Sequence, residues 1–336
     1  MAKPVLLMTG PMPPIIDRGL RQTFDCHQLP PKGRTGTAAA GTETPEALLA
    51  RIGPAVEAVC TGGHTGVKTD EALMAALPGL KVIANLGVGY DSIDVAAAAR
   101  RGIVVANTPD VLTDEVADTA LGLLLMTVRE MSKAEAYLRA GRWAKEGDYR
   151  LSTASLRDRS VGIIGLGRIG KAIARRCEAF GLPVSYCGRR PQADVTYAYH
   201  ADPVSLAKAV DTLIAVIPGG AETRNIVDAQ VLEALGPRGI FINVARGTIV
   251  DEAALIDALR TGKILAAGLD VFVGEPSFNP NFLTLENAVL LPHIGSASIL
   301  TRERMGQLVV DNLAAYANRK PPLSPVAETP FSGWGG

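Results

Sequence analysis

Short apolar segments alternate along the chain with longer segments in which apolar residues recur every three or four positions. The short segments are rich in β-branched residues and predict strands at 4–8, 58–62, 81–87, 102–108, 161–167, 183–188, 212–218, 239–245, 265–272 and 288–293. The longer segments predict helices at 44–53, 69–79, 94–102, 170–181, 228–236 and 251–262, several of which end on glycine. This alternation predicts an α/β fold with doubly wound parallel sheets.

A chain of 336 residues is too long for one ordinary core, so we expect two domains. A helical pattern over 113–140, with Thr113 as its N-cap, would extend roughly 40 Å and connects them. We expect residues 1–106 and 296–336 to form one domain and residues 107–295 the other. The helix at 303–320 then returns to the first domain, and the Pro- and Gly-rich tail after Lys320 is expected to be mobile.

Composition excludes several classes of partner. The 34 Lys and Arg residues equal the 34 Asp and Glu residues, which argues against nucleic acid or an anionic membrane as a partner. No apolar run approaches the roughly 18 residues of a membrane span, and none resembles a signal peptide. The four cysteines are scattered without metal-type spacing, which fits a reducing compartment. We therefore expect a cytoplasmic protein without a metal.

A glycine-rich turn follows the predicted strand at 161–167. Gly165, Gly167 and Gly170 match the G-x-G-x-x-G pattern, in which the glycines permit a tight turn, a close approach to pyrophosphate and tight helix packing. The helix that follows would offer free N–H groups to phosphates. Strand, turn and helix in this order predict a dinucleotide site that includes Leu166, Arg168 and Ile169.

The next strand ends on Cys187-Gly188-Arg189-Arg190, where such sites often place an acidic residue for the ribose 2′-OH. Arginine side chains instead suit a 2′-phosphate, because their planar forks match its oxygens. This favours NADP(H), with NAD(H) as the weaker alternative. The other interpretation is a solvated Arg pair in a loop.

Three later strands also end in polar residues. They contribute Arg246, Asp270 with Glu275, and His293, at the sheet edge where ligands bind in open α/β folds. Each residue alone has a structural interpretation: a surface ion pair, a helix cap, a solvated acid or a buried histidine. Their order behind a dinucleotide motif favours catalysis.

These stretches, GLGRIG at 165–170, NVARG at 243–247, LDVF with EP at 269–276 and LPHIGSAS at 291–298, together resemble the D-isomer-specific 2-hydroxyacid dehydrogenases. The resemblance implies a Rossmann domain inserted in a flavodoxin-like substrate domain, and a catalytic set of Arg246, Glu275 and His293. It also implies that the backbone N–H groups of Val88 and Gly89 hold the substrate carboxylate, and that Arg246 and His293 bind the substrate as well. The cofactor-binding residues that it implies beyond the glycine turn and Gly188–Arg190 are Ile217, Pro218, Thr223, Val244, Ala245, Asp270 and Gly295.

The resemblance further implies reduction of a small 2-oxo acid, glyoxylate or hydroxypyruvate, to the D-2-hydroxy acid. Glu275 separates the chain from formate dehydrogenases of similar fold, which pair the histidine with glutamine. A reductase of phenylpyruvate, hydroxyphenylpyruvate or 2-ketogluconate is the alternative, and a non-catalytic dinucleotide-sensing corepressor a less favoured one. Helix 113–140 is expected at a homodimer interface, where Trp143 either reaches the partner or packs in its own subunit.

Overall fold

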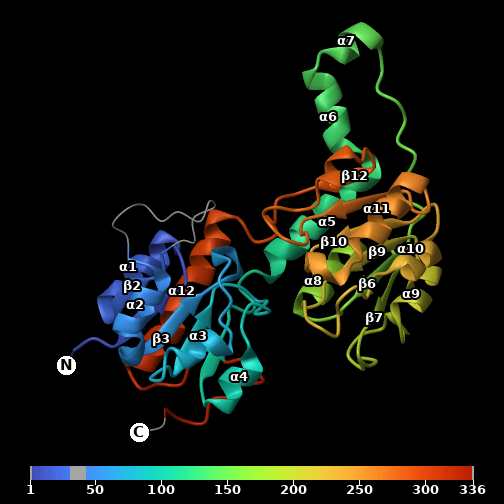
Figure 1. The fold of residues 1–336 in the computed structure, drawn as a ribbon. Helices are drawn as coiled ribbons and strands as arrows, with labels where there is room; N and C mark the ends of the chain where they lie inside the picture. Colours follow the sequence, from blue (N-terminus) through green and yellow to red (C-terminus); the bar gives the residue numbers. More distant parts are fainter. Residues whose placement is uncertain (1, 31–42, 335–336) are drawn as a thin grey trace. The chain divides into compact units, whose positions relative to one another are not determined.

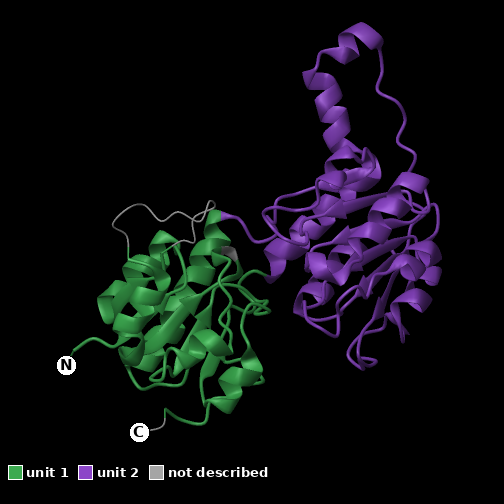
Figure 2. Ribbon diagram, viewed as in Figure 1, with its two compact units in different colours: residues 1–112, 299–336 green, residues 113–298 purple. Residues whose placement is uncertain are grey.

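The chain folds into two compact units, each built on one sheet. The computed structural model describes residues 2–30 and 43–334, without the side chain of His64. One unit comprises residues 1–112 and 299–336, and the other residues 113–298 (Figure 2). Both divisions fall a few residues after the expected positions, 106 and 295, because the helices that begin at Thr113 and Ile299 mark the changes of unit.

Unit 1 carries a parallel five-stranded sheet in the order β2-β1-β3-β4-β5. This is the flavodoxin-like order expected from the sequence. The strands are β1 (Val5–Met8), β2 (Asp25–Gln28), β3 (Val56–Thr61), β4 (Val82–Asn85) and β5 (Val104–Ala106). The helices are α1 (Pro14–Thr23), α2 (Pro45–Ile52), α3 (Glu71–Ala75), α4 (Val95–Arg100) and α12 (Ile299–Ala317), with short 3₁₀ turns η1 (Gly53–Ala55) and η2 (Gly63–Thr65).

The C-terminal helix α12 returns to unit 1, as the sequence predicts, and lies beside α1 (Figure 1). Gly306 makes this close packing possible, because a Cβ there would come within 2.5 Å of Ile15. The N- and C-terminal parts of the chain therefore share one core.

Unit 2 carries a parallel seven-stranded sheet in the order β12-β11-β10-β9-β6-β7-β8. The chain winds outward from β6 first to one side and then to the other, so the order reverses between β6 and β9, the position at which doubly wound sheets bind dinucleotides. The strands are β6 (Val161–Ile164), β7 (Val184–Cys187), β8 (Ala198–His200), β9 (Thr212–Ala215), β10 (Ile240–Asn243), β11 (Ala266–Leu269) and β12 (Ala288–Leu290). The helices are α5 (Thr113–Arg129), α6 (Met131–Arg139), α7 (Arg142–Glu146), α8 (Arg168–Ala179), α9 (Pro203–Ala209), α10 (Ala229–Leu235) and α11 (Glu252–Thr261), with 3₁₀ turns η3 (Gly247–Ile249) and η4 (Pro280–Thr284).

The central strands of unit 2 are apolar along their whole length because helices cover both faces of the sheet. All residues of β6, β9, β10 and β11 are buried. Helix α5 reaches β11 closely, since a Cβ at Gly268 would lie 2.6 Å from Thr127. The expected two-domain α/β architecture is therefore confirmed. Among the described residues, no helix is both long and apolar enough to cross a membrane.

The long helix expected over 113–140 is wrong as a single element. It breaks at Glu130, whose backbone takes a left-handed conformation with φ 52°. The backbone carbonyl of Glu130 accepts the N–H groups of Lys133 and Ala134, so this residue ends α5 and starts α6. A second left-handed residue, Gly141, separates α6 from α7. Together α6 and α7 form an arm that projects from the rest of unit 2 (Figure 1).

The expectation of a mobile tail after Lys320 is also wrong. The tail runs antiparallel to β5, where the backbone N–H of Val326 donates to the Val105 carbonyl at 2.8 Å. Thr329 accepts the Val105 N–H at 2.9 Å, and both Val326 and Thr329 are buried. Because β5 is the edge strand of its sheet, the tail satisfies backbone groups that would otherwise be open.

The strand and helix pattern also missed four elements: β2, β8, α1 and α9. His27 and His200, which stand in polar surroundings in the sequence, lie on two of them, β2 and β8. Both strands are at the outer edges of their sheets and are partly exposed, so they lack the apolar run that identifies a buried strand.

Candidate active site

The glycine-rich turn joins β6 to α8 at the carboxyl edge of the seven-stranded sheet. Gly165 has φ 98°, and a Cβ there would lie 2.4 Å from Ile217. A Cβ at Gly170 would lie 2.1 Å from the carbonyl oxygen of Gly165, so only glycine lets α8 approach the strand this closely. A Cβ at Gly167 would meet open space.

A polar pocket of about 980 Å³ opens beside this turn. Four cationic side chains line it, together with a single acid, Asp194; the cations are Arg168, Lys171, Arg189 and Arg190. Lys171 is paired with Asp194 at 2.6 Å, whereas Arg189 and Arg190 are exposed and have no ion pair among the described residues. A free helix terminus and unpaired arginines fit the pyrophosphate and the phosphate of a dinucleotide.

Arg246 follows β10 in a turn that is fixed on both sides. The buried Asn243 side chain accepts the Ala245 N–H and donates to the Arg246 carbonyl, both at 3.0 Å. A Cβ at Gly247 would lie 2.0 Å from the Phe272 carbonyl carbon, so glycine is required where the two strand ends meet. The Arg246 charge lies close enough to contribute to lowering the pKa of Glu275.

Glu275 and His293 form a hydrogen-bonded pair. His293 Nδ1 lies 2.6 Å from Glu275 Oε2, and the other oxygen, Oε1, accepts the Phe272 N–H at 2.7 Å. Burial by itself would raise the pKa of Glu275, but the hydrogen bonds from His293 and Phe272 outweigh it and hold the pKa below its ordinary value. The carboxylate is therefore charged at neutral pH.

His293 itself has φ 54°, a left-handed backbone conformation that non-glycine residues rarely adopt. Asp270, which is 1% exposed, holds the segment that follows: its two oxygens accept the N–H groups of Ile294 at 2.7 Å and Gly295 at 2.8 Å. Burial raises the pKa of Asp270, while these two hydrogen bonds oppose the shift. Asp270 thus fixes the loop that presents the His293 ring.

The other predicted cofactor residues of unit 2 lie at neighbouring strand ends. Ile217 and Pro218 follow β9, and the Thr223 hydroxyl donates to the Pro218 carbonyl at 2.8 Å. Val244 and Ala245 follow β10 and are buried. Parallel strands bring these segments to the same edge as the glycine turn and the Glu275–His293 pair.

Val88 and Gly89 lie in unit 1, in the loop after β4. The buried Asn85 amide donates to the carbonyls of Gly87 and Gly89, each at 3.0 Å. No group in the described ranges accepts a hydrogen bond from the backbone N–H of Val88 or Gly89. Two adjacent free N–H groups on a braced loop suit a carboxylate.

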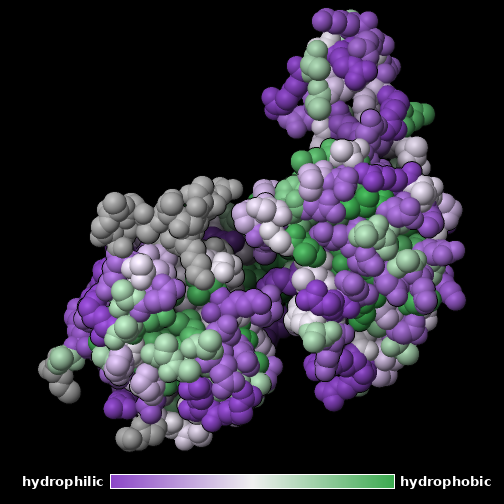
Figure 3. Space-filling model, viewed as in Figure 1, coloured by the Kyte–Doolittle hydropathy of each residue, from purple (hydrophilic) through white to green (hydrophobic). Residues whose placement is uncertain are grey.

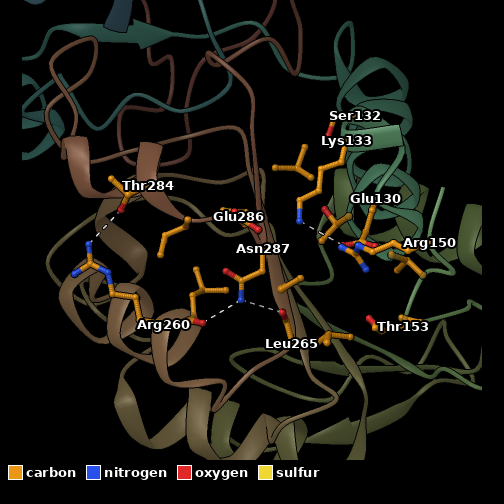
Figure 4. Close-up of a pocket in the computed structure, with 18 residues that line it drawn as sticks. Glu130, Ser132, Lys133, Arg150, Thr153, Arg260, Leu265, Thr284, Glu286 and Asn287 are labelled. Atoms are coloured by element: carbon orange, nitrogen blue, oxygen red, sulfur yellow. Dashed lines mark hydrogen bonds and ion pairs between the residues drawn. The ribbon is translucent and has the colours of Figure 1, made fainter. Parts of the chain in front are cut away.

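A second pocket, of about 400 Å³, lies elsewhere in unit 2 (Figure 4). Its walls include Glu130, Lys133, Arg150 and residues 284–289, at the base of the arm and before β12. It is therefore at the amino edge of the sheet, opposite the predicted site residues, and contains none of them. Within the described residues, no cluster of His, Cys, Asp or Glu is placed to hold a metal ion.

Two functional positions escaped the sequence analysis. Asn243 is buried and orders the Arg246 turn, and its signal was a lone amide at the end of an apolar strand. Lys171 adds a cation to the pocket beside the glycine turn, although in the sequence it resembles any solvated helix residue.

Comparison with known proteins shows the family to which the chain belongs. Residues 121–295 match the model of the D-isomer specific 2-hydroxyacid dehydrogenase, NAD binding domain. The chain belongs to this family. It is 46% identical over 264 residues to a glyoxylate/hydroxypyruvate reductase A of Arabidopsis thaliana, covering 79% of this chain and 84% of that one. It is 41% identical to a 2-ketogluconate reductase of Gluconobacter oxydans, covering 97% and 99%.

A solved structure extends the match over both units of the dehydrogenase. An NADPH-dependent glyoxylate/hydroxypyruvate reductase of Sinorhizobium meliloti, in complex with NADP and malonate, has a TM-score of 0.90 and 48% identity, covering 98% of each chain. The family and the fold predicted from the sequence are both confirmed.

Proposed function

We propose that this dehydrogenase uses NADPH to reduce a small 2-oxo acid, glyoxylate or hydroxypyruvate, to the D-2-hydroxy acid. The observation that carries the proposal is the His293–Glu275 pair, with Arg246 near the same carboxylate. In this proposal His293 is the proton donor, Glu275 is its charged partner, and Arg246 is the cation that binds an anionic substrate. The reductases of Arabidopsis and Sinorhizobium support the choice of substrate by their similarity.

The roles of the three residues follow from their contacts. Glu275 occupies Nδ1 of His293, which leaves Nε2 to donate a proton to the substrate oxygen. After the proton has left Nε2, the neutral ring keeps its hydrogen on Nδ1, where it remains hydrogen-bonded to Glu275. Arg246 binds the substrate carboxylate and orients the carbonyl, and the N–H groups of Val88 and Gly89 bind the carboxylate as well. Asp270 keeps the loop after His293 in place.

The cofactor supplies a hydride when bound. The glycine turn, residues 165–170, and the N-terminus of α8 hold its pyrophosphate. Arg189, with Arg190, binds the 2′-phosphate that distinguishes NADPH from NADH. Ile217, Pro218, Thr223, Val244, Ala245 and Gly295 line the remainder of the dinucleotide site.

We propose that the functional enzyme is a homodimer in which the arm of each subunit packs against the other. Helices α6 and α7 have no buried residue, and three of their large hydrophobic side chains are exposed to solvent: Met131 at 45%, Leu138 at 55% and Trp143 at 57%. Figure 3 shows mostly hydrophilic residues on the visible face of the arm, with a few hydrophobic ones among them. The Trp143 indole N–H donates to Asp148, which follows α7, and the side chain is 57% exposed, which supports a contact of its ring with a second copy.

The test is NADPH oxidation with a panel of 2-oxo acids: glyoxylate, hydroxypyruvate, phenylpyruvate, hydroxyphenylpyruvate and 2-ketogluconate. We expect the highest kcat/KM for glyoxylate or hydroxypyruvate. His293→Ala should lower kcat about 10²- to 10⁴-fold and still bind NADPH, because general acid catalysis contributes an effect of that size. A preference for the larger acids would select the alternative substrate class, and NADPH binding without any turnover would support a corepressor-like role.

A further inference from the structure

The C-terminal tail contacts the loop that carries Val88 and Gly89 by two separate routes, both within unit 1. The first route is through Tyr90, whose hydroxyl donates to both carboxylate oxygens of Glu328 at 3.1 Å. Burial raises the pKa of Tyr90, and the neighbouring Glu328 charge raises it further, so the phenol remains a hydrogen-bond donor at neutral pH.

The second route is through Asn107. Its side-chain amide donates to the Val88 carbonyl at 2.9 Å. Its own backbone carbonyl accepts the Ser324 hydroxyl at 2.7 Å, and its N–H donates to the Ser324 carbonyl at 3.2 Å. Ser324 is in turn held by the buried Asn312 of α12, whose amide donates to the Ser324 hydroxyl at 2.9 Å.

Beside these two contacts the tail is anchored to the core by Val326 and Thr329. Val326 is 5% exposed and Thr329 is 4% exposed, and both are hydrogen-bonded to Val105 of β5. Glu328 lies between them, so its carboxylate is carried by a fixed backbone although the side chain is exposed. The loop is thus held from inside by Asn85 and from outside by the tail.

We infer that the C-terminal tail is a positioning element for substrate binding: Glu328, through Tyr90, and Ser324, through Asn107, hold the loop over residues 87–90 in the conformation that presents the Val88 and Gly89 N–H groups to a carboxylate. The inference rests on the proposed role of this loop in binding the 2-oxo acid. Neither Glu328 nor Ser324 contacts the substrate in this scheme. Their loss therefore weakens substrate binding and leaves the hydride and proton steps intact.

The variants are Glu328→Gln, Tyr90→Phe, Ser324→Ala and the double variant Glu328→Gln/Tyr90→Phe. A hydrogen bond of this kind corresponds to roughly a two- to twelvefold change in an equilibrium constant. Glu328→Gln and Ser324→Ala should each raise KM for glyoxylate and the inhibition constant for malonate by that factor, with kcat and the Kd for NADPH unchanged. The double variant should equal Tyr90→Phe rather than the product of the two single variants, because Glu328 acts on the loop only through the Tyr90 hydroxyl, which Tyr90→Phe removes. Glu46→Gln, an exposed glutamate of α2, is the matched control.

Hydrogen–deuterium exchange supplies a readout that needs no turnover. The amides of Leu86, Gly87 and Ile93 are hydrogen-bonded, and their exchange should accelerate in Glu328→Gln and Ser324→Ala but not in Glu46→Gln. Unchanged exchange together with KM within twofold of wild type overturns the positioning role. Faster exchange in a protein that reduces no 2-oxo acid would keep the contact but refute the proposed function. A raised KM in Tyr90→Phe with an unchanged KM in both Glu328→Gln and Ser324→Ala would make Tyr90 a direct substrate contact and overturn the positioning role of the tail.

Discussion

At the scale of single residues, the site depends on which charges are held and which are left free. Glu275 accepts a backbone N–H of its own turn with one oxygen and contacts His293, which follows β12, with the other, so both carboxylate oxygens have a partner. Both oxygens of Asp270 accept backbone N–H groups, so this side chain holds the loop after His293 in place. Arg189 and Arg190, by contrast, have no ion pair in the described chain, which suits residues that neutralise a ligand.

The Glu275–His293 pair predicts a particular pH dependence. A carboxyl whose pKa is lowered by folding stabilises the folded state above its unfolded pKa, and that contribution is lost as the pH falls through the lowered value. Glu275 is therefore charged at neutral pH and places a negative charge 2.6 Å from His293 Nδ1. Glu275→Gln should shift the alkaline fall of the reductase rate to lower pH, measured as kcat/KM against pH. Glu233→Gln, on the exposed face of α10, should leave the profile unchanged; an unshifted profile in Glu275→Gln would show that this carboxylate is not coupled to the proton donor.

The unpaired arginines predict the cofactor preference. Hydrogen bonds to charged groups contribute about 1.5–3 kcal/mol, or roughly 10- to 150-fold in affinity. Arg189→Ala should therefore raise the Kd for NADPH at least tenfold and leave that for NADH nearly unchanged, because NADH lacks the 2′-phosphate. Titration calorimetry with both cofactors measures this, with Arg175→Ala, an exposed arginine of α8 outside the pocket, as the control. Equal weakening of both cofactors would assign Arg189 to another part of the dinucleotide.

At the scale of elements, the arm is the part of unit 2 whose helices bury no side chain against the rest of the chain. Its internal contacts are local: the Tyr137 hydroxyl donates to the Gly147 carbonyl, and the Tyr137 and Tyr149 rings meet at 5.3 Å. Helix α6 nevertheless has no buried side chain. An isolated helix of nine residues is marginal in water, which supports the proposal that a second copy of the chain packs against α6.

The proposed dimer contact predicts that a charge placed on the arm weakens dimerisation. The wild-type protein should have the mass of two chains by sedimentation or light scattering at micromolar concentration. Leu138→Asp should raise the dimer dissociation constant at least tenfold, because an unpaired carboxylate at an interface is costly to desolvate. Phe180→Asp changes a hydrophobic residue of unit 2 that is 44% exposed outside the arm, and should have no such effect. A monomeric wild-type protein would contradict the proposed role of the arm.

At the scale of the whole molecule, the chain order and the spatial order differ. The first 112 residues and the last 38 share one unit, and the dinucleotide-binding unit lies between them in sequence. The tail closes the edge of the first sheet, so the end of the chain completes a core begun by its first strand. A segment with four prolines and three glycines after Lys320 can do this because extended backbone suits proline at a sheet edge.

The packed tail predicts a stability effect far from the active site. Val326→Ala removes buried apolar surface and should lower the free energy of unfolding by about 1.5–3 kcal/mol, as measured by urea denaturation. Leu323→Ala changes a side chain of the same tail that is 59% exposed, and should alter it by no more than about 0.5 kcal/mol. Equal and negligible effects would mean that the tail is mobile in solution.

The sequence by itself determined the fold class, the family and the nature of the chemistry. Apolar periodicity reveals buried parallel strands because such strands are covered on both faces, and the glycine turn is readable because only glycine fits its close approaches. Arg246, Glu275 and His293 could likewise be predicted, since each follows a strong strand signal, although their catalytic role stays a prediction.

Only the tertiary structure decided where these patterns stop. Glu130 ends a helix that its local sequence would continue, because a left-handed backbone there starts α6 in a new direction. Edge strands β2 and β8 were missed because partial exposure removes the apolar run. The Tyr90–Glu328 contact joins residues 238 positions apart, and no local pattern encodes a pairing that the folded core alone brings together.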